Sequence, residues 1–167
     1  MPDSKTPDTP GGTLSCTAYC TTIQGACTAA NLQYSDMATC VATCAHFTVG
    51  AASDTSGDTL GCRTNHAMLA QTGPGTHCVH AGPSGGGVCG MPCEGFCSIV
   101  VPECPTQWPS ATTCPTMCAG LNPVPAYTAN VQSGDSLSCR IYHATAASTN
   151  PTTHCPHTAV TGSATCQ

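Results

Sequence analysis

The sequence predicts a mostly α-helical, small and disulfide-rich fold, built as a tandem duplication of a three-helix module with long irregular loops. The segment 57–80 (GDTLGCRTNHAMLAQTGPGTHCVH) returns at 134–157 as GDSLSCRIYHATAASTNPTTHCPH. The chain also holds 16 cysteines in 167 residues, a content typical of small exported domains held together by disulfides. Cysteines recur four residues apart, a spacing that places both members of a pair on one face of a helix.

The duplication predicts two disulfide-rich modules, at residues 14–90 and 91–167, behind a disordered linker at residues 1–13. The linker mixes Pro, Asp, Ser, Thr and Gly without periodicity, which is typical of flexible tethers. We interpret it as a frayed terminus, or as a tether below a lipid or wall anchor upstream of residue 1. Only three residues separate the last cysteine of one module from the first of the next, so the modules should abut.

Composition limits the compartment and the partners. Charged residues are 7% of the chain and aromatic residues 4%, against about 25% charged residues in an ordinary soluble domain. The core is therefore small, and disulfides worth about 2–4 kcal/mol each should carry the stability. The cysteines indicate an extracellular, cell-surface or periplasmic location, with the export signal not in this chain. The net charge of −5 and the single lysine disfavour nucleic acid as a partner, and no apolar run is long enough for a transmembrane segment.

The first part of each module predicts a stapled helical hairpin. Cys16 and Cys20 are four residues apart, as are Cys40 and Cys44. Two antiparallel helices with these spacings can be joined twice, and we expect the pairs Cys16–Cys44 and Cys20–Cys40. The first helix should cover about 14–28, and the second should begin at Ser35 or Asp36 and run to Phe47. Their predicted buried residues are Tyr19, Ile23, Cys27, Met37, Val41 and Phe47.

Within each module the twin C-x3-C spacing resembles two families of cysteine-stapled helical hairpins. They are the chaperones of the mitochondrial intermembrane space and the plant α-hairpinin defence peptides. The resemblance covers about thirty residues per module and implies the hairpin fold alone. In those families function lies in residues outside the cysteines, and neither functional set is identifiable here. Each module of this chain also adds four cysteines and three histidines to the hairpin.

The second part of module one predicts a third helix followed by an irregular segment. Asp58 is the expected N-cap, 59–71 the helix body and 73–75 a turn leading to Thr76–His80. Four cysteines remain, and three pairings are open. We favour Cys62–Cys78 and Cys27–Cys89. The first of these would bring His66, His77 and His80 within about 10 Å of one another.

Module two repeats this plan with a connection three residues shorter. We expect Ser110 to cap its second helix and Pro115 to lie in the first turn of that helix. Trp108, the single tryptophan, is placed over the junction between the modules. His46 has no counterpart in module two and is interpreted as a surface residue. Glu94 and Glu103 are interpreted as exposed helix charges.

The candidate site is a triplet of histidines in each module. Neutral imidazole is a common ligand of zinc and copper, and three convergent rings leave a coordination position open. A haem interpretation uses one or two of the histidines axially, with Arg63 or Arg140 against the propionates. The competing interpretation is that histidines and arginines only hold the scaffold together by hydrogen bonds. The predicted metal ligands for Cu, Zn or haem iron are His66, His77, His80, His143, His154 and His157.

Three functions from different classes follow. The first is an exported structural or surface-binding protein that self-assembles into extracellular fibres or contacts a cell-surface component. The alternative is a metal or haem carrier with one site per module, in extracellular redox or metal handling. The third is a secreted inhibitor or defence domain that uses the loops at 28–39 and 105–113. Nucleophilic catalysis is disfavoured, because the cysteines are expected to be bridged and acidic residues are sparse.

Overall fold

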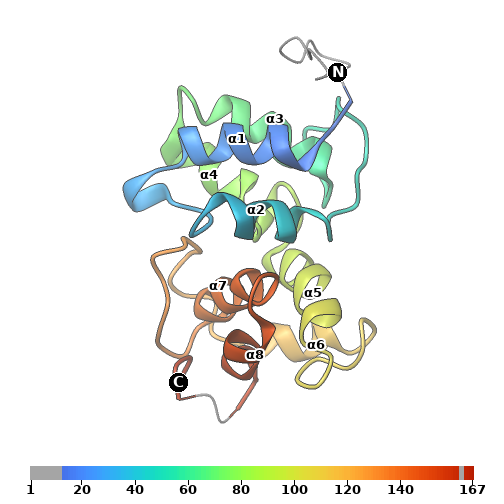
Figure 1. Cartoon of the computed structure of the whole chain (residues 1–167), viewed down its shortest axis with the longest axis vertical. Coiled ribbons are helices and arrows are strands. Elements are labelled where there is room, and N and C mark those ends of the chain that lie inside the picture. The colour runs from blue at the N-terminus through green and yellow to red at the C-terminus, as the bar shows by residue number, and fades with distance from the viewer. Residues whose placement is uncertain (1–12, 162–163) are drawn as a thin grey trace.

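The computed structural model describes residues 13–161 and 164–167, and over these residues all the regular secondary structure is helical (Figure 1). The predicted linker lies outside the described residues except for Thr13. The described part holds eight α-helices, three short 3-10 helices and no strand. The α-helices are α1 (Cys16–Ala26), α2 (Met37–Cys44), α3 (Leu60–Leu69), α4 (Pro74–Ala81), α5 (Pro92–Glu103), α6 (Cys114–Ala119), α7 (Leu137–Ala147) and α8 (Pro151–His154). The 3-10 helices are η1 (Ala29–Asn31), η2 (Gly85–Gly87) and η3 (Cys155–Thr158).

The helices form two groups that follow the order of the chain. Figure 1 shows α1 to α4 at one end of the molecule and α5 to α8 at the other. We call these groups the first and second halves. All 16 cysteines are bridged, and each of the eight disulfides joins two residues of the same half. The predicted fold class is confirmed. None of the described helices has the length and apolar character needed to cross a membrane.

Each half begins with the predicted stapled hairpin. The bridges Cys16–Cys44 and Cys20–Cys40 join α1 to α2, as expected from the spacing. In the second half α5 and α6 are joined by Cys93–Cys118 and Cys97–Cys114. Side-chain caps fix the helix starts of the first hairpin, because Ser15 accepts from the Ala18 amide and Asp36 from the Thr39 amide.

The buried stripe of the first hairpin matches the prediction except at two positions. Tyr19, Ile23 and Cys27 are fully buried, and Phe47 is nearly so. Met37, predicted to be buried, is 42% exposed. It is the first residue of α2, at the end of the helix. Val41 is only half-buried against the core.

Two predictions for the second part of the first half are wrong. The N-cap of α3 is Thr59, whose hydroxyl accepts from the Cys62 amide at 3.1 Å. Asp58 instead forms an ion pair with Arg63. The segment predicted to be irregular after Gly73 is the helix α4, because Pro74 occupies the first turn, where its missing N–H has no partner to lose. The third helix is therefore followed by a fourth.

The favoured pairing of the remaining cysteines is also wrong. The structure has Cys27–Cys78 and Cys62–Cys89. Because 74–81 is helical and packs beside α3, Cys78 faces the end of α1 rather than the start of α3. The glycine-rich loop then carries Cys89 back to the first turn of α3. Residues 104 and 155, and 139 and 166, repeat this pattern in the second half.

The second half is built around Trp108. Its ring is fully buried, packs edge-on against Phe96 with centroids 4.9 Å apart, and donates from Nε1 to the Thr158 carbonyl at 3.1 Å. It therefore lies inside the second half rather than over the junction. Helix α6 begins at Cys114 after Thr113, so Ser110 is not its cap, and Pro115 lies in the first turn as predicted.

Contacts between the halves use residues that the sequence analysis did not place at the junction. Nε2 of His46 lies 2.6 Å from Oε1 of Glu103, and both side chains are mostly buried, contrary to the expected surface positions. The Tyr127 hydroxyl donates to the Gln33 carbonyl at 2.9 Å, and the Ala129 amide to the Leu32 carbonyl at 2.7 Å. Glu94 stays within its own helix, where it accepts from the Met91 amide.

Candidate metal centre

The three histidines of the first half come from two helices that pack against each other. His66 lies in the middle of α3, and His77 and His80 are three residues apart on α4. That spacing places both α4 rings on one face, directed at α3. The prediction that the three rings meet is confirmed, although the bridge from which it was argued is absent. The helical form of 74–81 brings them together instead.

The ring nitrogens of the three histidines lie close to one another. Nδ1 of His66 lies 3.0 Å from Nδ1 of His77. The ring centroid of His80 is 5.0 Å from that of His66 and 6.0 Å from that of His77. One nitrogen from each ring falls in a group whose members all lie within 4.8 Å of one another. Nδ1 of His80 is buried and has no hydrogen-bond partner in the part of the chain that the structure describes.

A main-chain carbonyl favours one tautomer of the central histidine. Nε2 of His66 lies 3.3 Å from the Thr55 carbonyl oxygen. Since a carbonyl can only accept, a hydrogen bond here needs the hydrogen on Nε2, and that tautomer presents the lone pair of Nδ1 to the cluster. This arrangement is common for histidines that ligate metals, whose second nitrogen donates to a carbonyl or carboxylate.

The second half reproduces the cluster, and the contact between its first two histidines uses the same atoms. Nδ1 of His143 lies 2.9 Å from Nδ1 of His154 and 3.3 Å from Nδ1 of His157. Nε2 of His143 lies 3.2 Å from the Gln132 carbonyl oxygen, the counterpart of Thr55 in the repeat. The cluster persists although α4 is replaced by α8 and η3.

Proline explains that replacement. Pro156 stands where the first half has Val79, and proline cannot donate the hydrogen bond that would continue α8. The chain tightens into the 3-10 helix η3 and still directs His157 toward His143, with ring centroids 4.5 Å apart.

The environment keeps several of these rings neutral. Burial lowers the pKa of His143 to about 4, and the neighbouring His157 and His154 act in the same direction. Burial, followed by the other histidines of its cluster, also lowers the pKa of His80, and burial and His157 lower that of His154. Neutral imidazole is the form that binds metals, so protons compete poorly for these nitrogens.

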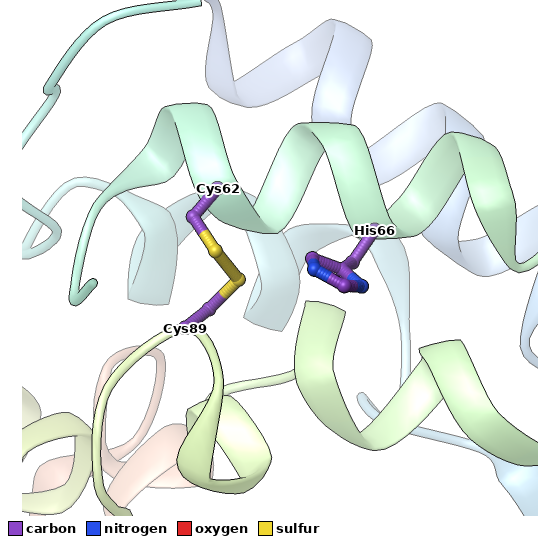
Figure 2. Close-up of side chains that lie close together, drawn as sticks. All are labelled: Cys62, His66 and Cys89. Atoms are coloured by element: carbon purple, nitrogen blue, oxygen red, sulfur yellow. A yellow bond between two sulfur atoms is a disulfide. The ribbon is translucent and has the colours of Figure 1, made fainter. Parts of the chain in front are cut away.

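A disulfide lies beside the central histidine of each cluster. Figure 2 shows the His66 ring next to the Cys62–Cys89 bridge. The two sulfur atoms and one nitrogen of His66 lie within 4.8 Å of one another, and all three residues are buried. The group Cys139, His143 and Cys166 repeats this arrangement in the second half.

The two arginines lie in the core and face the main chain. Arg63 donates to the Gly82 carbonyl, and its NH2 group lies 2.7 Å from Oδ1 of Asp58. Its guanidinium also lies 4.1 Å above the centre of the Phe47 ring. Arg140 donates to the carbonyls of residues 136, 159, 160 and 166 and pairs with Asp135. These contacts tie α3 and α7 to the loops that close each half.

Sequence reasoning missed three features of the site. The carbonyls of Thr55 and Gln132 have no side-chain signal, because any residue supplies that group. Tyr142 packs edge-on against His143, with centroids 5.0 Å apart, where the first half has Asn65. The neighbouring disulfides depended on the pairing that the sequence left open.

Together these features define a class of small helical protein in which disulfides hold two clusters of three histidines and one bridge borders each cluster. A family model matches residues 9–92, just over half of the chain, and its description is BfoA family C-terminal domain. The chain therefore belongs to the BfoA family. The match spans the first histidine cluster, and the second lies outside it. No match was found among curated proteins or among solved structures.

Proposed function

We propose that the protein binds two metal ions, one at each histidine cluster, and acts in metal handling or redox chemistry in an oxidising compartment. The observation that carries this proposal is the convergence of one ring nitrogen from each of three histidines in each half. Two nitrogens bound to one ion at about 2.0–2.1 Å are about 2.8–3.4 Å apart for bond angles of about 90–109°. The nitrogen distances of 2.9, 3.0 and 3.3 Å lie in this range.

The donor set favours a divalent ion of borderline softness. Three neutral imidazoles suit Zn²⁺ and Cu²⁺ better than Mg²⁺ or Ca²⁺, which prefer oxygen ligands. No carboxylate joins the histidine groups within the described residues. The bound ion would keep its full charge and an open position for water or an exogenous anion, as in three-histidine catalytic zinc sites.

A single ion fits the clusters better than haem. Haem iron takes its axial ligands from opposite faces of a flat macrocycle, whereas here three nitrogens point to one position. The arginines that would hold propionates already bind main-chain carbonyls. The haem site, fibre formation, attachment to a cell-surface component and inhibition of a partner stay predictions.

Metal content tests the proposal. Protein purified natively, without chelator or metal-affinity steps, should carry about two equivalents of zinc or copper by plasma mass spectrometry. The double variant His77→Ala/His80→Ala should lose one equivalent, and His154→Ala/His157→Ala the other, because each cluster keeps a single ligand.

His46→Gln is the matched control, since it removes the one histidine that lies outside both clusters. It should retain both equivalents. Equal metal content in the wild type and in both double variants would overturn the proposal, and so would a metal-free wild type that takes up neither ion from solution.

A further inference from the structure

We propose that, before the Cys62–Cys89 bridge closes, its two thiolates and His66 bind one soft or borderline metal ion such as Zn²⁺ or Cu⁺. The same holds for Cys139, Cys166 and His143 in the second half. This thiol-state site shares His66 or His143 with the histidine cluster, and it differs from the cluster in its two sulfur ligands and in the stage at which it exists. It does not rest on the proposed function, because it needs neither of the two α4 histidines.

The first support is the position of the ligand atoms. The sulfurs of Cys62 and Cys89 and one ring nitrogen of His66 lie within 4.8 Å of one another, and Figure 2 shows the ring beside the sulfur pair. Two cysteines and one histidine are a donor set found in zinc proteins. Both halves place the same three residue types together, so the arrangement is part of the duplicated unit.

The backbone already has a spacing that suits two thiolates on one ion. The Cα atoms of Cys62 and Cys89 are 5.6 Å apart, and those of Cys139 and Cys166 are 5.8 Å apart. Sulfurs bound to a tetrahedral zinc at about 2.3 Å lie about 3.8 Å apart, against about 2.05 Å in a disulfide. The difference of about 1.7 Å lies within the reach of side-chain rotation, so the helix and loop need not move.

These two bridges are distinguished from the others by their histidine neighbour. Among the described residues, the other six disulfides contribute no cysteine to a group of potential metal ligands. These six are the two hairpin staples of each half, the bridge from α1 to α4 and its counterpart Cys104–Cys155. Cys62–Cys89 and Cys139–Cys166 combine the structural role with a ligand geometry.

Because the bridge is buried once it has formed, the thiol-state site can exist only while the protein folds. Cys62 and Cys89 are fully buried and His66 is 8% exposed, so external thiols do not reach the closed bridge. Buried thiolates are costly unless a cation neutralises them. A bound ion supplies that charge until the bridge forms.

Closure is an ordinary exchange with a disulfide of low molecular weight or of an oxidoreductase. One thiolate attacks a sulfur of that partner and forms a mixed disulfide, and the second thiolate displaces the partner sulfur. The two cysteines lose two electrons and the partner leaves as two thiols. The metal ion keeps its oxidation state and loses its sulfur ligands.

Oxidative refolding of the full chain tests this inference. Reduced protein is refolded with oxidised glutathione, with Co²⁺ or with EDTA, and remaining thiols are alkylated at intervals and located by mass spectrometry. Metal at ten times its Kd should slow closure of Cys62–Cys89 and Cys139–Cys166 about tenfold, because exchange needs free thiolate. The other six bridges should close at the same rate with and without the ion. The delayed intermediate should show a thiolate-to-cobalt charge-transfer band.

Two variants separate this site from the histidine clusters. His66→Ala should abolish the delay at Cys62–Cys89, whereas His77→Ala/His80→Ala should preserve it even if the oxidised variant binds no metal. The inference is overturned if Co²⁺ slows all eight bridges alike, slows none of them, or still slows Cys62–Cys89 in His66→Ala. None of these results depends on whether the oxidised protein holds an ion.

Discussion

The two halves satisfy the same buried carbonyl group with different side chains. In the first half the Tyr19 hydroxyl donates to the carbonyl of Ala81 at 2.6 Å and lies 2.8 Å from the Tyr34 hydroxyl. In the second half the position of Tyr19 is taken by Phe96, and Trp108 donates to the carbonyl of Thr158 instead. Residues 81 and 158 are equivalent in the repeat. The comparison shows that duplication preserved the hydrogen-bond requirement of the core while its aromatic residues changed.

The histidine clusters changed less than the core around them. Nδ1 separations between the first two histidines differ by only 0.1 Å between the halves, at 3.0 and 2.9 Å. The helix that carries the last two histidines nevertheless differs in type. In both halves one ring nitrogen of each of the three histidines still lies within 4.8 Å of the other two.

The largest expected loss of stability comes from removing the bridge that has the widest sequence separation in each half. Cys27–Cys78 and Cys104–Cys155 both span 51 residues. The double variants Cys27→Ala/Cys78→Ala and Cys104→Ala/Cys155→Ala should each lower the free energy of unfolding by about 4 kcal/mol. Denaturant unfolding of the metal-free protein measures this loss. Unequal losses of unfolding free energy would show that equivalent bridges do not contribute equally to the stability of the two halves.

The difference between Tyr19 and Phe96 at equivalent positions predicts the next largest effect on stability. Tyr19→Phe leaves the Ala81 carbonyl without its donor and should cost about 1–3 kcal/mol. The reverse change, Phe96→Tyr, should not stabilise the second half, because Trp108 already donates to the Thr158 carbonyl and the new hydroxyl would be buried beside it. Thermal unfolding of the two variants measures the difference. Stabilisation by Phe96→Tyr would contradict this account of the core.

The two ion pairs should respond unequally to loss of the carboxylate. The Asp58 side chain is 29% exposed and that of Asp135 is 68% exposed, while both arginine partners are buried. Asp58→Asn should cost about 1.5–3 kcal/mol, because the buried Arg63 guanidinium loses its opposite charge at a shielded site. Asp135→Asn should cost at most about 1 kcal/mol. Equal costs in urea unfolding would mean that solvent screening does not distinguish the pairs.

Acidity should destabilise the metal-free protein through the second cluster. The pKa of His143 falls from an ordinary value of 6.5 to about 4 on folding, mainly through burial. Between these values the unfolded chain binds more protons than the folded one, so stability falls as the pH drops from about 6.5 toward 4. The lowered pKa values of His80 and His154 act in the same direction. Unfolding at stepped pH should show a shallower slope for His143→Gln, and an unchanged slope would contradict the assignment.

The elements that the sequence predicted were those fixed by local spacing. The C-x3-C pairs determine which helix faces meet, so the hairpin bridges could be paired without a structure. The pairing of Cys78 could not, because it depends on whether Pro74 ends a loop or begins a helix. Both readings fit the letters Gly-Pro-Gly, and only the packing of α4 on α3 decides between them. The cap of α3 posed the same problem, because either Asp58 or Thr59 could fill that position. Asp58 forms an ion pair with Arg63 instead, and Thr59 is the cap.

The candidate site was predicted as a set of residues but not as a geometry. The repeat identified all six histidines, because both copies retained them. The orientation of the central rings, His66 and His143, depends on contacts with the carbonyls of Thr55 and Gln132, which lie in loops with no regular pattern. The role of each arginine likewise depends on carbonyl groups far away in the sequence, such as those of Gly82 and Cys166.

Every disulfide lies within one half, so each half is a separately cross-linked unit. The main chain between Cys89 and Cys93 is the only covalent link between the two halves of the described structure. One cut there would leave two closed, cross-linked pieces that separate on a non-reducing gel once the contacts around His46 and Tyr127 are melted. A third copy could be added after residue 167 in the same way, without any existing cysteine changing its partner. Such a chain would gain one more cluster of three histidines for each unit added.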